Sequence, residues 1–320
     1  MPNANYSQYN TNAVAVLNAH SAAYFAWYEA AVVIYVLGAI AFVAWWFFRG
    51  RLLLGGAIGL AAAGAACQAA SLGLRWYYSG HVPWNDLYGS LSVVTFFAVI
   101  LFMAFGARYK IWFAGPFVLA FTDALLGYAR YWNKGLEPLV PSLQSYWIYI
   151  HVPVVLSAYA AFLIGFCTSI LYLLKKRDEG RLSAAAGRSV GAAVASNPAA
   201  AGLARPWFLE WLELVPPAVK LDIVTYRVNA IGEILLTFGI ILGALWAHDV
   251  WGSYWQWDPK ETAILVSWII YAAYLHLHTR PSMRGAASAW LSIIAFLSIM
   301  FCYFGINIWI SGLNSLHTYR

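Results

Sequence analysis

The sequence predicts an all-α, polytopic membrane protein with about eight transmembrane helices. Hydrophobic residues make up 62% of the 320 positions and charged residues only 10%. The apolar runs are long enough to cross about 30 Å of hydrocarbon. Inside lipid a helix satisfies its own backbone polar groups, whereas the alternating pattern of a membrane β-barrel is absent. We therefore expect one integral membrane domain over residues 1–320.

Eight apolar runs are the expected spans. The fourth is short and contains Pro116 and Asp123, and the seventh is also short but lies beside a tryptophan-rich segment. In chain order the spans are Tyr28–Phe48, Leu52–Leu74, Leu87–Phe105, Ile111–Leu126, Ile148–Leu174, Val228–Trp246, Thr262–His278 and Ala286–Ile310.

The distribution of basic residues predicts the orientation. Fourteen of the 19 lysine and arginine residues fall in one set of loops, which should face the cytoplasm. Residues 1–27 then form an external tail without a secretory signal, because they hold no lysine or arginine. Residues 175–227 form a cytoplasmic loop and residues 247–262 an external segment. Because the basic residues follow the topology rather than one patch, nucleic acid is not an expected partner.

The cytoplasmic loop has two parts. It opens with the charged sequence KKRDEGR and is rich in alanine, glycine and serine as far as Ala204, a composition typical of a flexible linker. A short interfacial helix should follow, although docking onto a partner is an alternative. Its apolar face would consist of Trp207, Phe208, Trp211, Leu212 and Val215.

The most informative segment reads WAHDVWGSYWQWDPKE and begins at Trp246. Its indoles predict a flat aromatic shelf for a large planar ligand, although an interfacial tryptophan belt is the alternative. Gly252 would allow close approach, and Asp258 with Pro259 would end the run. The shelf residues are Trp246, Trp251, Trp255 and Trp257.

The ordered motif WGSYWQWDPKET resembles the tryptophan-rich WWD signature of haem-handling proteins. The PKET continuation, the eight spans and the chain length favour the CcsA (ResC) family of System II cytochrome c maturation over CcmC and CcmF of System I. The resemblance covers spans two to eight. It implies non-covalent haem b as cofactor and substrate, bound by the shelf together with Gly252 and Asp258.

Two histidines on the shelf side are candidate haem ligands, because neutral imidazole suits iron and two imidazoles hold it six-coordinate. From the residues alone, His151 could equally cap span five, and His317 could lie in a disordered tail. Their segments, SLQSYWIYIHVPVVLSAYAA and SGLNSLHTY, resemble the two external histidine segments of the family. The resemblance makes His151 and His317 the axial ligands and the catalytic residues, although Asn314–Leu316 separate Gly312–Leu313 from the second histidine.

A second pair of histidines lies at the cytoplasmic end of span seven. Ungapped counting from WDPKET matches His276 to the inner histidine of the family, whereas the following Thr279–Arg280 favours His278. The two lie on opposite helix faces and should not ligate one iron. We expect both to contact haem and His276 to be the ligand, although a histidine there could merely complement the helix dipole.

The remaining polar residues have weaker assignments. His81 should be structural, because Pro83 and Asp86 predict a turn that opens span three. His248 could reach a haem propionate, although it more simply belongs to a solvated loop. Glu233 is unusual inside span six and could meet a partner chain or water in a haem channel. The three cysteines lie inside spans, and no CxxC or CxxCH is present.

The resemblance implies a function. Haem would be held outside and attached to the CxxCH of apocytochrome c, with a CcsB/ResB-type membrane subunit supplying a second inner ligand. The location would be a bacterial cytoplasmic membrane or a thylakoid-type membrane. Two other classes remain open. A cytochrome b electron-transfer subunit needs paired histidines at matching depth, and an unrelated solute transporter favours midplane charges, for which only Glu233 and Asp123 are candidates.

Overall fold

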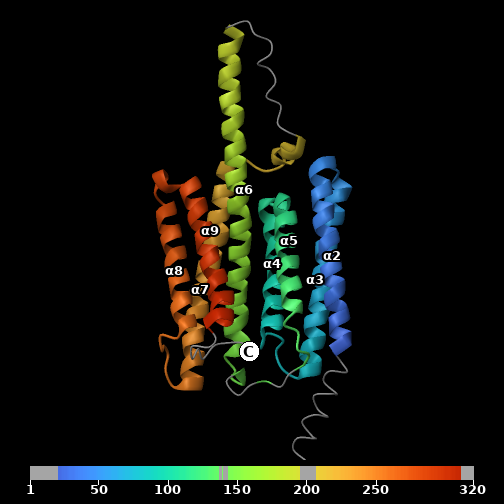
Figure 1. Ribbon diagram of the computed structural model, residues 1–320, viewed down its shortest axis with the longest axis vertical. Helices are drawn as coiled ribbons and strands as arrows, with labels where there is room; N and C mark the ends of the chain where they lie inside the picture. Colours follow the sequence, from blue (N-terminus) through green and yellow to red (C-terminus); the bar gives the residue numbers. More distant parts are fainter. Residues whose placement is uncertain (1–20, 137–138, 140–142, 195–206, 311–320) are drawn as a thin grey trace, which may run out of the picture.

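The structure, a computed structural model, describes the chain except for residues 1–20, 137–138, 140–142, 195–206 and 311–320 (Figure 1). The described residues form helices and connecting turns without a strand, which confirms the predicted all-α class. Within them, seven helices are long and apolar enough to cross a membrane. Seven of the predicted spans coincide with these helices, although Ile111 lies just outside the fourth helix and residues 307–310 lie beyond the last, and the seventh predicted span lies within a helix of 20 residues.

The helices are few and long. In the part of the chain that the structure describes, short 3₁₀ helices join or precede them, namely η1 (Trp112–Ala114), η4 (Trp207–Glu213) and η5 (Pro281–Met283). The long helices are α2 (Ser21–Phe48), α3 (Arg51–Ser79), α4 (Leu87–Tyr109), α5 (Gly115–Arg130), α6 (Ile148–Val194), α7 (Ala218–Trp251), α8 (Pro259–His278) and α9 (Ala286–Met300), which continues as the π-helix η6 (Phe301–Ile310).

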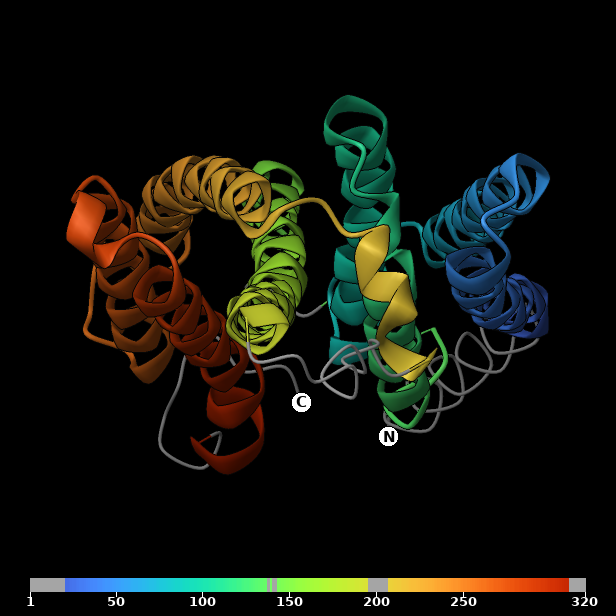
Figure 2. The same cartoon turned by 90° about the horizontal axis from the view of Figure 1, so that it is seen from above.

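The helices gather into two groups that meet at α4 and α6. Figure 2 shows α6, α7, α8 and α9 together on one side, with α4 and α5 between them and the α2–α3 pair. The α3–α4 turn, the start of α6 and the α7–α8 connection lie at the same end of the bundle, here called the tryptophan end (Figure 1). The opposite end, which carries the turns after α2, α4 and α8, is called the basic end.

Helix α6 is longer than expected. It continues as a helix to Val194 and projects beyond the other helices at the basic end (Figure 1). The prediction of a flexible linker is therefore wrong for Lys175–Val194. The physical reason is the high alanine content of this stretch, because alanine is the best helix former and a composition rich in small residues does not by itself exclude a helix. Residues 195–206 of the predicted linker lie outside the described part.

The predicted interfacial helix is present as η4, and it docks on the bundle. The Trp211 ring stacks on Trp46 of α2 with centroids 4.3 Å apart, while Leu212 and the following Val215 are buried. The Lys175 ammonium group donates to the carbonyl oxygen of Leu212 over 2.7 Å. Trp211, Leu212 and Val215 of the predicted face therefore pack against protein at the basic end.

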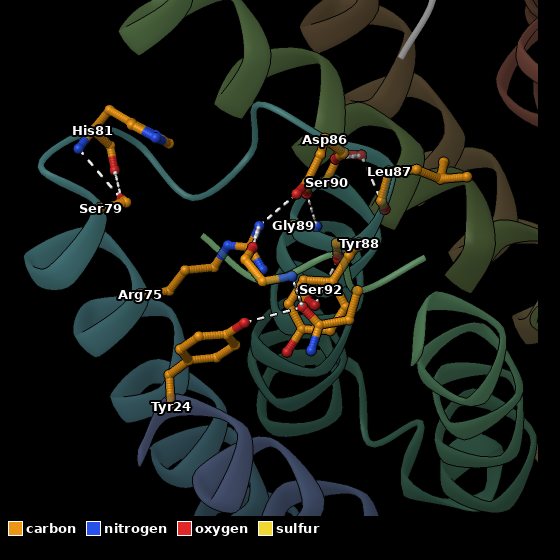
Figure 3. Close-up of polar contacts among 12 residues, drawn as sticks. Tyr24, Arg75, Ser79, His81, Asp86, Leu87, Tyr88, Gly89, Ser90 and Ser92 are labelled. Carbon is orange, nitrogen blue, oxygen red and sulfur yellow. Dashed lines mark hydrogen bonds and ion pairs between the residues drawn. The ribbon is translucent and has the colours of Figure 1, made fainter. Parts of the chain in front are cut away.

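The α3–α4 turn is fixed by a buried ion pair (Figure 3). The guanidinium of Arg75 pairs with Asp86 and lies 4.6 Å from the ring centroid of Tyr88. The other carboxylate oxygen of Asp86 caps α4 by accepting from the Gly89 amide over 2.6 Å. A side chain at Gly89 would collide with the carbonyl oxygen of Pro83. The predicted turn at Pro83 and Asp86 is confirmed.

Candidate functional site

His151 lies in the first turn of α6, at the tryptophan end. Its Nδ1 atom bonds to the carbonyl oxygen of Gly239 on α7 over 2.9 Å. Because a carbonyl oxygen only accepts, Nδ1 carries the hydrogen, and in the neutral ring Nε2 is the unprotonated nitrogen. A Cβ atom at Gly243 would lie 2.7 Å from Cε1 of the imidazole, so a glycine there lets the ring pack against α7. Metal-binding histidines commonly have this arrangement.

A tryptophan of the last turns of α7 packs beside this imidazole and itself contacts a second tryptophan. The Trp246 ring is buried and lies nearly parallel to that of His151, with centroids 5.8 Å apart and an interplanar angle of 25°. Trp251, the last residue of α7, meets Trp246 at 63° with centroids 5.1 Å apart. The structure therefore brings together three of the residues that the sequence singles out.

The α7–α8 connection is shorter than the predicted external segment 247–262. Helix α7 reaches Trp251 and α8 begins at Pro259, so only residues 252–258 connect them. Gly252 ends α7 with a positive φ of 74°, and its amide donates to the carbonyl oxygen of His248 over 2.9 Å. No atom lies within 4 Å of an added Cβ. The glycine thus provides a left-handed helix cap, and the space beside it stays open, so the expected close approach of a ligand there stays a prediction.

Trp255 and Trp257 form a second pair in this connection. Their rings meet edge to face at 88°, with centroids 5.8 Å apart. Because Trp246 and Trp251 are also steeply inclined to each other, the four indoles do not form the one flat shelf that the sequence predicts. The Trp257 side chain is 68% exposed and its φ is 55°, an uncommon value for a bulky residue. Such backbone strain concentrates at ligand-binding and catalytic sites.

Asp258 and Glu261 anchor the connection to α8. The Asp258 carboxylate accepts from the backbone of the first turn, including the Lys260 amide at 2.8 Å. The Glu261 carboxylate accepts in return from the amide of Asp258 at 3.2 Å and from that of Gln256 at 2.8 Å. This is a capping box. The acidic residues of WDPKET therefore fix the backbone directly after Trp255 and Trp257.

The two histidines at the basic end of α8 have different surroundings. His278 is buried, and its Nε2 atom lies 3.1 Å from a carboxylate oxygen of Asp222 on α7. The Tyr226 ring stacks on His278 with centroids 4.5 Å apart. His276 is exposed. The prediction that the two histidines lie on different faces of the helix is confirmed. His317 lies outside the described residues.

Sequence reasoning missed an aromatic cluster that braces the start of α6. The indole nitrogen of Trp84, in the α3–α4 turn, donates to the carbonyl oxygen of Ile148 over 3.2 Å. Trp76 contacts Trp84 edge to face and also meets Tyr149. His151 follows Ile148 by three residues. The sequence offered a clue to this contact, because Trp84 directly follows Pro83 in the GHVPWND motif and so belongs to the turn predicted before span three.

Comparison with known proteins defines the family. The sequence profile described as cytochrome c assembly protein matches residues 84–314. The chain belongs to this family, as the WWD motif predicts. It is 35% identical over 255 residues to the cytochrome c biogenesis protein CcsA of Synechococcus sp. (strain CC9902), covering 77% of this chain and 81% of that protein. It is 36% identical over 258 residues to the CcsA of Nymphaea alba, covering 78% and 82%.

A solved structure shares the fold. The cytochrome c haem lyase CcmF superposes with a TM-score of 0.58 at 16% sequence identity, over 89% of this chain. The chain spans about half the length of that structure, 46%. At this identity the likeness concerns the arrangement of helices alone.

Proposed function

We propose that this protein holds haem and presents it to apocytochrome c during the maturation of c-type cytochromes. The observation that carries the proposal is the fixed imidazole of His151, whose Nδ1 is bonded to Gly239 and whose ring lies beside Trp246. The relatives named cytochrome c biogenesis protein CcsA support the same role. In this proposal the tryptophan end faces outward and the basic end faces the cytoplasm, as the distribution of lysine and arginine favours.

The external site would hold non-covalent haem b through Nε2 of His151, with His317 on the other side of the iron. Neutral imidazole is a suitable ligand for haem iron. The shelf tryptophans, Gly252 and the cap residue Asp258 would enclose the ring. Each CxxCH thiol would add across one vinyl group, so that a C–S bond forms and the thiol hydrogen passes to the other vinyl carbon. The histidine of CxxCH would displace one axial ligand.

The inner site would use His276. Its exposure leaves the imidazole on the outer surface of α8, where a second chain can supply the other axial ligand. His278 is held instead by Asp222 and Tyr226, inside the bundle. A CcsB/ResB-type membrane subunit is the partner that we propose for this surface. Together the two chains would form a cytochrome c synthetase.

An absorption spectrum of the purified protein tests the proposal. We expect a low-spin bis-histidine haem spectrum that His151→Ala weakens and that added imidazole restores. His81→Ala is the matched control, because His81 lies at the same end and bonds to the backbone of Val82. Protein purified from haem-replete cells without any haem signal would overturn the proposal, and an unchanged spectrum in His151→Ala would remove this residue from the ligand set.

A further inference from the structure

A row of polar side chains runs along the buried face of α7. Its four members follow at intervals of four residues and therefore share one face of the helix. Three of them have partners on neighbouring helices. Thr225 donates to Thr168 of α6 over 2.8 Å, and Asn229 donates to Ser292 of α9 over 2.8 Å. The fourth residue of the row, Thr237, accepts from the indole of Trp268 of α8 over 2.8 Å.

Glu233 is the exception in this row. Its side chain is 7% exposed, and within the described part of the chain both carboxyl oxygens lack a hydrogen-bond partner. Buried polar atoms in folded proteins almost always have partners, so an orphaned carboxyl group needs an explanation. In the membrane interior an ionisable side chain is a candidate for function by default.

A second orphaned group lies at the same depth on α8. Helices α7 and α8 run in opposite directions, with Trp268 beside Thr237 and His278 beside Asp222. This alignment places Tyr271 level with Glu233. The Tyr271 ring is fully buried, and its hydroxyl group has no partner among the described residues.

Phe162 of α6 completes this layer. Its ring stacks on Tyr271 with centroids 3.6 Å apart. It also lies against Gly232, where an added Cβ would come within 2.6 Å of Cε1. Glu233, its neighbour Gly232, Phe162 and Tyr271 therefore occupy one cross-section of the α6–α9 group, and the two aromatic rings close its interior at that level.

The layer lies between the two proposed haem sites. His276, the proposed inner ligand, follows Tyr271 by five residues on α8, about 8 Å along the helix axis. Gly239, which binds the His151 ring, follows Glu233 by six residues on α7, about 9 Å in the other direction. A ligand that moves between the two ends within this helix group passes the layer midway.

We propose that Glu233 and Tyr271 form a mid-membrane waypoint that hydrogen-bonds the propionate groups of haem as it moves from the basic end to the external site. The proposal rests on the proposed function. In this proposal Glu233 is the neutral acid, because an unpartnered carboxylate in an apolar interior is costly. As a carboxylic acid and a phenol, the two side chains are neutral donors on facing helices.

Neutral hydrogen-bond donors suit a site that haem passes through better than a site at which haem stays bound. A buried lysine or arginine would form an ion pair with a propionate, and such pairs are costly to separate in a low dielectric. A hydrogen bond from a neutral donor to a carboxylate is weaker and is broken more readily. The Tyr271 ring must also swing away from Phe162 to open the interior. Because its hydroxyl group has no partner, this rotation sacrifices no hydrogen bond.

Haem distribution in purified variants tests the waypoint. We expect Glu233→Leu and Tyr271→Phe to lower haem at the His151 site about tenfold, the effect of losing one hydrogen bond to a charged group. Haem at the basic end should stay at or above the wild-type amount. The spectrum of His151→Ala defines that inner signal. Asp123→Leu, which removes a membrane carboxyl group of α5, and Tyr274→Phe on α8 are the matched controls and should leave the distribution unchanged.

Glu233→Gln separates donation from proton release. The amide still donates, so this variant should resemble wild type. If it behaves like Glu233→Leu, Glu233 acts by releasing a proton and the waypoint is wrong. Equal filling of both sites in Glu233→Leu and Tyr271→Phe would also overturn it.

Infrared difference spectra of haem-free protein provide an independent readout. The carboxylic acid C=O band should be present in wild type at neutral pH and lost in Glu233→Gln, and its absence from wild type would refute the neutral donor. Wild-type protein that never carries haem would instead overturn the proposed function, and the route with it.

Discussion

The indole of Trp84 donates a hydrogen bond to the carbonyl oxygen of Ile148, 3.2 Å away, and thereby ties the α3–α4 turn to the first turn of α6. His151 lies one helical turn further along. The turn itself is held by the pairing of Arg75 with Asp86. The helices before α6 therefore set the position of an imidazole that packs against α7.

Replacing Trp84 with Phe should loosen the proposed external site. The ring volume is largely kept, but the Ile148 carbonyl loses its donor, at a cost of about 1 kcal/mol. Haem affinity at the His151 site should fall about fivefold, as measured by haem titration. Trp290→Phe on the exposed surface of α9 is the control. Equal affinities in the two variants would show that the α3–α4 turn does not position His151.

Gly243→Ala should displace the His151 ring. The new methyl group would lie 2.7 Å from Cε1, which is closer than real Cβ contacts allow. We expect the external haem signal to be lost while the inner signal remains. Gly55→Ala provides the control, because no atom lies within 4 Å of an added Cβ there. A Gly243→Ala protein with a normal external signal would argue against a ligand fixed on α7.

Substitutions at Trp257 should separate backbone strain from ligand contact. Trp257→Gly relieves the left-handed conformation and should raise stability by about 1 kcal/mol over Trp257→Ala, which keeps the strain. Both variants remove the indole and should lower external haem. Thermal unfolding of the haem-free proteins measures the first effect and absorption spectra the second. A glycine variant less stable than the alanine variant would show that the indole holds the connection together.

The histidines of α8 should respond differently to alanine. His278→Ala leaves Asp222 without its partner and should cost about 1–3 kcal/mol of unfolding free energy. His276→Ala should leave stability within about 0.5 kcal/mol, because the side chain is exposed. It should nevertheless lower haem at both sites, and imidazole should restore part of it. If imidazole rescued His278→Ala but not His276→Ala, His278 and not His276 would be the inner haem ligand.

Hydropathy predicts the spans well because each apolar run must be long enough to cross lipid, and apart from Ile111 the eight runs coincide with helical segments. The helix ends are less predictable. Composition suggests a linker at Lys175–Val194, yet alanine favours helix in a folded and in a linker context alike. Likewise, polar residues between Ala247 and Trp251 suggest a loop, although α7 continues there with its polar side outward.

The candidate site is predictable in its residue types but not in its geometry. The WWD motif identifies the tryptophans, yet their edge-to-face pairing depends on the Gly252 cap and the strained Trp257 backbone. The hydrogen bond from His151 to Gly239 joins two different helices through residues that are 88 positions apart in sequence. Single-sequence patterns carry no information on such contacts. His317 as the second external ligand stays a prediction.

Helix α6 has 47 residues, which corresponds to about 70 Å, more than twice the thickness of a hydrocarbon core. This excess length gives the protein a rigid projecting segment to which another domain can be attached. A small domain fused in helical phase near Ala184 would inherit the orientation of the segment that carries His151. Such a fusion would give electron-microscopy particles a feature for alignment and give spectroscopists a fixed reference for measuring distances to bound haem.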